Sequence, residues 1–123
     1  LPAGFNSSDC KLLKLPDRRQ SIVPSDKPGG RIVFEDAEKD ADSTEASEYD
    51  DVSVRNCEGI CYTYGGNNTV TYPEIDEKVV DKMFKPETDE TVLEWENDKH
   101  SYRLFGTVGR DELIKIAEGI SGV

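Results

Sequence analysis

The sequence predicts an α+β fold, in which a curved antiparallel sheet has a C-terminal helix packed on one face. Two observations carry this prediction. Residues 91–106 alternate apolar and polar side chains on either side of a polar turn, which is typical of a hairpin with one buried face. After Gly109, apolar residues recur at the spacing of one helix face, namely Leu113, Ile116, Ala117 and Ile120.

The C-terminal hairpin and helix have clear local boundaries. Leu93 and Trp95 alternate with acidic residues in the first strand, and residues 97–100 form a polar loop. Gly109 is an acceptable helix N-cap, and the acidic residues after it favour the positive end of the helix dipole. The apolar stripe of this helix is expected to lie on the hairpin that precedes it.

The N-terminal part predicts only short extended segments. Residues 10–15 are expected to form a strand that ends at Pro16. Residues 17–30 contain two prolines and a Gly-Gly pair, so they are expected to be a loop with a short extended piece at 21–23. A strand is predicted over residues 31–34.

The middle of the chain predicts a second hairpin and a second helix. Residues 51–56 and 60–64 are expected to pair around Glu58-Gly59, because Gly adopts positive φ readily. A strand over residues 70–72 follows. An amphipathic helix is expected from Pro73 to the residues before Pro86.

Residues 35–51 are rich in Asp, Glu, Ala and Ser and are expected to form a solvated, mobile insertion in a single domain that spans residues 1–123. Acidic residues at 36, 38, 40 and 42 have the spacing of a calcium loop. The segment lacks the turn glycine and the bidentate Glu of such a loop. The prediction is therefore a solvated insertion, and a calcium-stabilised adhesive module is the alternative.

Composition excludes several classes of partner. The net charge of −11 argues against nucleic acid and against an anionic membrane surface, because both need clustered Lys and Arg. No apolar run approaches the ~20 residues that span a bilayer. No signal peptide is visible, because Leu1-Pro2-Ala3-Gly4 lacks a basic start and an apolar middle. The membrane anchor that the family resemblance described below implies is expected to lie outside this stretch of sequence. No cofactor and no metal site are expected.

The three cysteines and the single histidine are the residues most suited to nucleophilic or metal chemistry. Cys57 and Cys61 could form a disulfide across a tight hairpin, whereas small half-buried apolar side chains are the more ordinary role. Their spacing does not fit a zinc site. His100 falls in a predicted loop without a nucleophile and an orienting acid. No catalytic residue is therefore predicted, and the chain is expected not to be an enzyme.

Aromatic residues are the candidate ligand-binding groups. Their ordinary role is packing in the sheet, because strand alternation alone accounts for their positions. The functional alternative is an aromatic-lined groove for a lipid, glycan, peptide or protein. The residues that would line it are Tyr62, Tyr64, Trp95 and Tyr102.

The sequence from Glu94-Trp-Glu through Tyr102-Arg-Leu-Phe-Gly to Asp111-Glu-Leu-Ile-Lys-Ile-Ala-Glu-Gly-Ile resembles the end of an uncharacterised extracytoplasmic domain of Gram-positive bacteria. That domain occurs in anti-sigma-factor-like membrane proteins and lipoproteins. It is distantly similar to the sigma-factor regulator RseB and to LolA-like lipoprotein carriers. The opening Leu1-Pro2-Ala3-Gly4-Phe5 is similar to the start of the family.

The resemblance implies a fold and a location rather than a reaction. The fold would be a reduced open half-barrel over an apolar concavity. The function would be a non-enzymatic extracytoplasmic sensing or binding domain of a membrane-anchored regulatory protein. The alternative is a carrier-like module for a lipid or lipoprotein.

Overall fold

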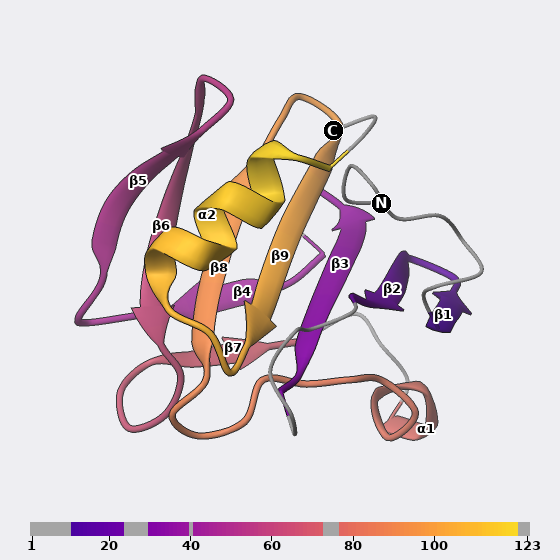
Figure 1. The fold of residues 1–123 in the computed structure, drawn as a ribbon. Coiled ribbons are helices and arrows are strands. Elements are labelled where there is room, and N and C mark those ends of the chain that lie inside the picture. Colours follow the sequence, from indigo (N-terminus) through magenta and orange to yellow (C-terminus); the bar gives the residue numbers. More distant parts are fainter. Residues whose placement is uncertain (1–10, 24–29, 40, 73–76, 121–123) are drawn as a thin grey trace.

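In a computed structural model, seven antiparallel strands form one sheet in the order β1-β2-β3-β9-β8-β6-β5 (Figure 1). The structure describes residues 11–23, 30–39, 41–72 and 77–120. The strands of this sheet are β1 (Lys11–Leu15), β2 (Arg18–Ile22), β3 (Ile32–Glu38), β5 (Asp50–Val54), β6 (Cys57–Thr63), β8 (Thr91–Glu96) and β9 (His100–Gly106). Within the described residues β1 and β5 remain unpaired to each other, so the sheet is open.

Two layers flank this sheet. Helix α2 (Arg110–Glu118) packs across β8, β5 and β9. A separate two-stranded ribbon of β4 (Ser43–Glu45) and β7 (Thr69–Thr71) lies behind the sheet in Figure 1, on the side opposite α2. The predicted α+β fold with an antiparallel sheet and a C-terminal helix is confirmed. The half-barrel of a carrier protein is a finer description that these features leave open.

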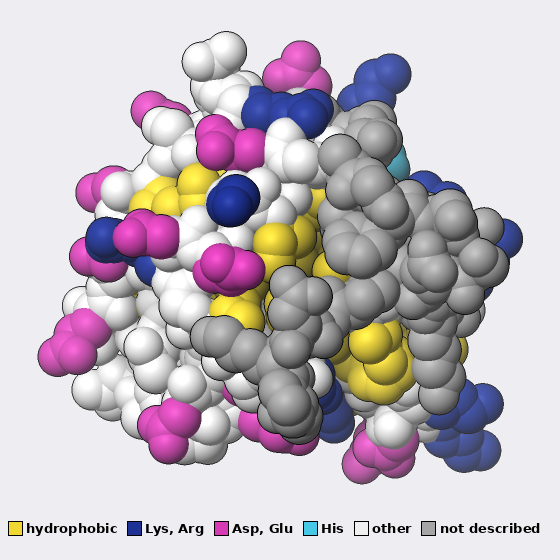
Figure 2. Space-filling view, in the orientation of Figure 1, with side chains coloured by type: hydrophobic (Ala, Val, Ile, Leu, Met, Phe, Trp, Pro, Cys, Tyr) yellow, Lys and Arg dark blue, Asp and Glu magenta, His cyan; other side chains and the backbone are white. Residues whose placement is uncertain are grey.

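The main core lies between the sheet and α2. Leu113, Ala117 and Ile120 from the predicted stripe are fully buried, and they pack with Leu93 and Leu104 of the hairpin. Burial of one such leucine contributes about 2 kcal/mol. The N-cap at Gly109 is also as predicted. Figure 2 shows this side of the molecule, where acidic and basic side chains are interspersed on the surface around the helix.

Successive side chains along a strand point to opposite faces, so a second set of side chains lies on the face of the sheet opposite α2. Val33, Tyr62, Val92 and Phe105 form a small buried cluster there. The same face carries polar residues in the neighbouring register positions, including Glu35, Glu94 and Arg103. The sheet is therefore apolar on its helix face, and on its ribbon face it is partly apolar and partly charged.

The middle hairpin turns at a different place from the prediction. The two-residue turn is Arg55-Asn56, and both residues have positive φ, 47° and 69°. This is the geometry of a type I′ turn. Gly59 instead lies inside β6, where an added Cβ would overlap the carbonyl oxygen of Glu94 on β8. The glycine is needed for close approach of two strands and not for a turn.

Residues 35–51 also differ from the prediction of a mobile insertion. Glu35 to Glu38 complete the central strand β3, and residues 43–45 form β4. Glu35 is only 1% exposed. Asp40, one residue of the calcium-like spacing, lies outside the described residues. Glu35 can be buried within the sheet because the guanidinium groups of Arg18 and Arg103 compensate its charge.

The remaining elements agree with the prediction in part. Strand β1 is as predicted, apart from Cys10, which lies outside the described residues. Residues 18–22 form strand β2 rather than a loop, because they pair with both β1 and β3. The predicted helix after Pro73 is seen as the short α1 (Glu77–Val80), and residues 73–76 lie outside the described residues.

Candidate functional site

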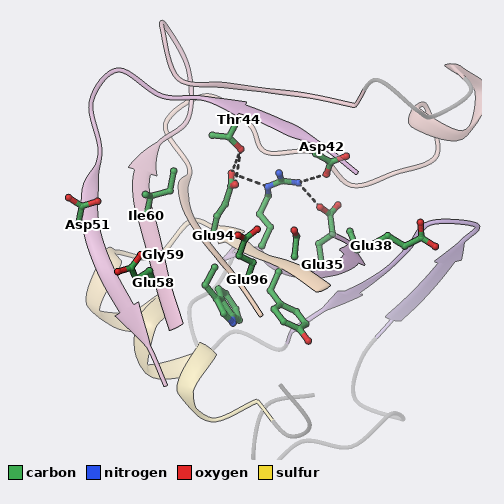
Figure 3. Close-up of a pocket in the computed structure, with 15 residues that line it drawn as sticks. Glu35, Glu38, Asp42, Thr44, Asp51, Glu58, Gly59, Ile60, Glu94 and Glu96 are labelled. Carbon is green, nitrogen blue, oxygen red and sulfur yellow. Dashed lines mark hydrogen bonds and ion pairs between the residues drawn. The ribbon is translucent and has the colours of Figure 1, made fainter. Parts of the chain in front are cut away.

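A pocket of about 390 Å³ opens on the ribbon face of the sheet (Figure 3). Strands β3, β9, β8 and β6 form its floor. One wall is formed by Asp42, which precedes β4, and by Thr44, which lies in β4. Acidic side chains dominate the lining, with seven carboxylates against the single guanidinium of Arg103. The carboxylates are Glu35, Glu38, Asp42, Asp51, Glu58, Glu94 and Glu96.

Strand register explains how the floor is assembled. Arg103 on β9 lies directly opposite Glu35 on β3 and opposite Glu94 on β8. Ile60 on β6 lies opposite Glu94 in turn. Directly opposed residues in an antiparallel sheet project from the same face. One arginine therefore stands between two glutamates drawn from the neighbouring strands.

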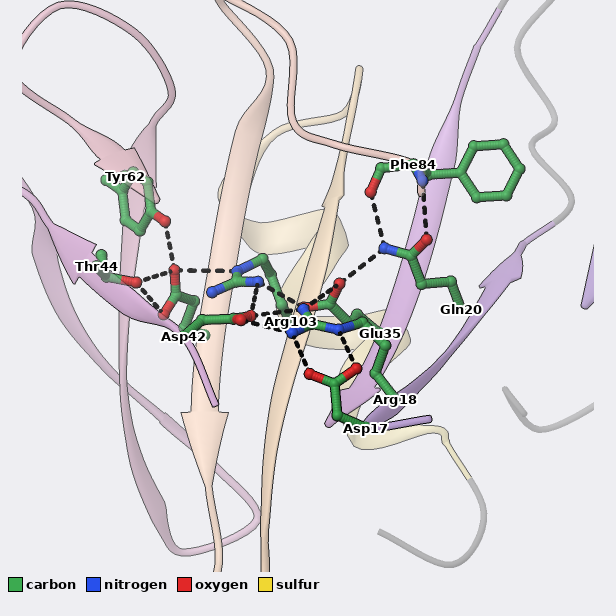
Figure 4. A network of polar contacts seen from close by, with 10 residues as sticks. Asp17, Arg18, Gln20, Glu35, Asp42, Thr44, Tyr62, Phe84 and Arg103 are labelled. Atoms are coloured by element: carbon green, nitrogen blue, oxygen red, sulfur yellow. Dashed lines mark hydrogen bonds and ion pairs between the residues drawn. The ribbon is translucent and has the colours of Figure 1, made fainter. Parts of the chain in front are cut away.

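Arg103 is the central cation of the floor. Its Nη1 donates to Glu35 Oε1 at 2.5 Å and to Asp42 Oδ2 at 3.0 Å, and its Nε donates to Glu94 Oε2 at 3.2 Å (Figure 4). The residue is 5% exposed. Burial alone would lower the pKa of this guanidinium, but the carboxylates, Glu35 first, outweigh burial and raise the pKa.

A second buried arginine, on β2, joins this network. Arg18 donates to both oxygens of Asp42 at 2.7 and 2.6 Å and also pairs with Asp17 at 2.7 Å. Gln20 donates to Glu35 Oε2 at 2.7 Å and to the carbonyl oxygen of residue 84 at 2.7 Å. The network therefore connects β2, β3 and β9 to the chain segment between α1 and β8.

Two tyrosines and a threonine complete the network. Tyr62 donates to a Glu94 oxygen, and Thr44 Oγ1 lies 2.7 and 2.8 Å from the two Glu94 oxygens. The Tyr72 ring lies against both guanidinium groups, at 5.2 Å from Arg18 and 5.8 Å from Arg103. Burial, together with Glu94, raises the pKa of Tyr62, which keeps its hydroxyl a donor at neutral pH.

The charges of this site do not cancel. Two guanidinium groups, those of Arg18 and Arg103, face four carboxylates in the network: Asp17, Glu35, Asp42 and Glu94. At the rim, Glu38, Asp51 and Glu58 are exposed and have no cationic partner within the described residues. Glu96 has only Lys39 at 3.9 Å. The pocket therefore carries a negative potential that favours cationic groups.

The four aromatic residues predicted to line a groove are not gathered on one face. Tyr62 lies on the ribbon face under Glu94, and Tyr64 is half-buried beside the same small cluster. Trp95 and Tyr102 belong to floor strands, but their rings stack with each other in the helix-side core, with centroids 5.5 Å apart. The sheet therefore separates the two pairs of residues.

The possible disulfide between Cys57 and Cys61 is not formed, and both are free thiols, half-buried and buried respectively. They belong to one strand, β6, so their Cα atoms are about 13 Å apart. A disulfide needs Cα atoms within about 7 Å of each other. Burial, followed by the nearby Asp50, raises the pKa of Cys61 to about 11, which makes this thiol unreactive near neutral pH.

His100 lies at the start of β9 rather than within a free loop. Its Nδ1 is 2.5 Å from Asp36 Oδ1 on β3, and the side chain is half-exposed. No hydrogen bond joins this pair to a Ser, Thr or Cys side chain in the described part of the chain. Among the same residues, no three His, Cys, Asp or Glu side chains are arranged to hold a metal ion.

The residues that make the pocket were missed at the sequence level. Their signal is a charged residue at an inward position of an otherwise apolar strand, as Arg103 is between Tyr102 and Leu104. The pairing of Arg103 with Glu35 joins positions 68 residues apart, and that of Arg18 with Asp42 joins positions 24 apart. Local patterns carry no information about such partners.

Across the described residues, no helix is long and apolar enough to cross a bilayer. Comparison with curated proteins and with solved structures found no match to this chain. A family model does match, over residues 25–120, which covers β3 through α2 and every residue of the pocket lining. The chain therefore belongs to the family described as a domain of unknown function, DUF4367.

Proposed function

We propose that this chain is a non-enzymatic binding domain that takes up a cationic ligand in the acidic pocket. The observation that carries the proposal is the excess of carboxylates over guanidinium groups around a pocket of about 390 Å³. Glu38, Asp51 and Glu58 at the rim are exposed and have no cationic partner within the described residues, so they are available to a ligand. Every charged group of the floor network has an oppositely charged partner, which gives the site a rigid base.

The biological setting that we propose follows from the sequence resemblance over residues 91–120. In that setting the domain lies outside the cytoplasm, in a membrane-anchored regulatory protein of the anti-sigma-factor or envelope-stress type. Binding of a ligand would there report on conditions in the cell envelope. The resemblance supports this setting, and the pocket supports the binding role independently of it.

A lipid-carrier role is less well supported by the same geometry. Acyl chains need an apolar cavity, because moving them beside carboxylates leaves charged groups desolvated without partners. The pocket on the ribbon face is lined by carboxylates, and the opposite face of the sheet is filled by α2. We therefore place the ligand among peptides or proteins with cationic groups.

Neutralising the rim carboxylates tests the pocket directly. In the triple variant Asp51→Asn/Glu58→Gln/Glu96→Gln, we expect the affinity for tetralysine to fall about 10-fold or more, because each lost charge removes ~0.3–1 kcal/mol of attraction. Isothermal titration calorimetry at about 50 mM salt, where screening is weak, measures this change. All three residues are exposed, so the fold should survive.

The matched control removes the same number of charges elsewhere. Asp89→Asn/Glu112→Gln/Glu118→Gln changes exposed carboxylates that do not line the pocket. We expect it to retain most of the wild-type affinity. Equal losses in the two triple variants would mean that tetralysine responds only to net charge, which would contradict a binding site in the pocket.

A further inference from the structure

Strand β5 ends the seven-stranded sheet and has no neighbour on its outer side within the described residues. Its register with β6 closes on the two-residue turn Arg55-Asn56, so Val54 and Cys57 form the hydrogen-bonded pair next to the turn. Hydrogen-bonded pairs alternate along an antiparallel ladder. The backbone N–H and C=O groups of Asp51 and Ser53 therefore point outward, away from the sheet.

The surroundings of this edge are acidic and carry one exposed aromatic ring. Asp51 lies on β5 itself and Glu58 on the paired strand, and both line the pocket. Tyr49, immediately before β5, is 50% exposed and is the one large hydrophobic side chain classed as exposed among the described residues. The edge thus combines unpaired backbone groups, an apolar contact and negative charge.

We propose that β5 is the docking edge for an extended, basic polypeptide segment, which adds a strand to the sheet beside Asp51 and Ser53. This inference rests on the proposed function, because alternate Lys or Arg side chains of the added strand would lie over the acidic pocket. Side chains on one face of a strand recur about every 7 Å, so successive cations can reach successive rim carboxylates.

Charge decides which strands this edge accepts. Exposed carboxylates on an edge strand repel another acidic edge, which is how proteins prevent unwanted strand pairing. The chain itself carries a net charge of −11, so most of its own surface is a poor partner for β5. A basic segment gains both the backbone hydrogen bonds and the charge attraction, which makes the edge selective for basic partners.

A proline at Ser53 tests the edge without touching the pocket. Proline removes the outward N–H of residue 53 but leaves the β5–β6 ladder intact, and an edge strand tolerates proline at such a position. We expect Ser53→Pro to weaken binding of an acetylated and amidated peptide of alternating Lys and Thr by about 10-fold or more. Ser53→Ala, which keeps the N–H, should bind like the wild type.

If Ser53→Pro does not fold, binding of N-methylated peptides to the wild-type domain tests the same pairing. N-methylation of one peptide residue at a time removes single N–H donors from the peptide. Pairing with β5 predicts that methylation at every second residue abolishes binding to the wild-type domain and that methylation between these residues does not. Uniform tolerance of methylation would overturn the edge inference.

The outcomes separate this inference from the proposed function. Suppose that the peptide binds the wild-type domain, that the rim triple variant weakens this binding and that Ser53→Pro does not. The acidic pocket is then the binding site, and the proposed pairing with β5 is wrong. If neither the peptide nor tetralysine binds the wild-type domain, the proposed function itself fails. A peptide of alternating Glu and Thr should not bind, and its binding would contradict both proposals.

Discussion

Replacing Arg103 with methionine is expected to lower the free energy of unfolding by about 3–5 kcal/mol, because the change removes the buried cation that contacts Glu35, Asp42 and Glu94. The buried Glu35 loses its shortest ion pair, at 2.5 Å, and keeps only Arg18 at 3.3 Å. Urea denaturation at neutral pH measures the effect. Arg19→Met, which removes an exposed arginine at 3.4 Å from Asp36, should change the midpoint little.

Two further results would identify the buried charges as the cause. Arg103→Met/Glu35→Gln should recover part of the loss, because it removes the stranded carboxylate. The deficit of the single variant should also shrink as the pH falls from neutral towards about 4.3, the ordinary pKa of a glutamate. Burial raises the pKa of Glu35, and a carboxyl whose pKa is raised in the folded state takes up its proton there first, so acid favours folding. A deficit independent of pH and additive with Glu35→Gln would contradict this explanation.

Gly106→Ala is expected to destabilise the domain by about 3 kcal/mol through overpacking of the central strand pair. A Cβ at residue 106 would overlap the backbone carbonyl oxygen of Arg31, which cannot move independently of β3. The same oxygen accepts a hydrogen bond from the Thr107 N–H at 2.9 Å, so its displacement also strains that bond. The urea midpoint of Gly106→Ala compared with the wild type measures this loss.

Gly109→Ser is the matched control for this substitution. An added Cβ at Gly109 has open space around it, and the residue is an N-cap in extended conformation. Serine is favoured at such a cap, so the variant should be as stable as the wild type or slightly more stable. A Gly106→Ala variant as stable as the wild type would contradict this prediction, because it would show that β3 and β9 can move apart at residue 106 without loss of stability.

The C-terminal third could be predicted from sequence because its information is local. Alternation in residues 91–106 and the 3.6-residue spacing of Leu113, Ala117 and Ile120 each require only near neighbours in the chain. The middle hairpin was misplaced because Gly59 carries the ordinary turn signal, whereas Arg55 at positive φ has none. A glycine required by strand contact is indistinguishable in sequence from a glycine required by a turn.

The acidic pocket could not be predicted because the residues that form it are distant in sequence. Several of them are also charged residues that are buried, whereas charged residues are ordinarily expected at the surface. Residues 35–51 have the composition of a solvated segment, yet Glu35 is buried by its pairing with Arg103. Composition reports the charge of a residue and not the partner that compensates it. The four aromatic residues of the predicted groove lie on opposite faces of the sheet for a related reason. Period-2 alternation shows which residues of one strand share a face, but it does not show which faces of two separate strands lie on the same side of the sheet.

Chemical-shift mapping would show directly whether a cationic ligand binds in the acidic pocket. The ¹⁵N-labelled domain would be titrated with the peptide of alternating Lys and Thr, and each backbone amide followed by NMR. We expect the largest shifts at the pocket and the edge strand β5, at Asp51, Ser53, Gly59, Ile60 and Glu96. Shifts confined to α2, or no shifts at saturating peptide, would contradict binding in the pocket.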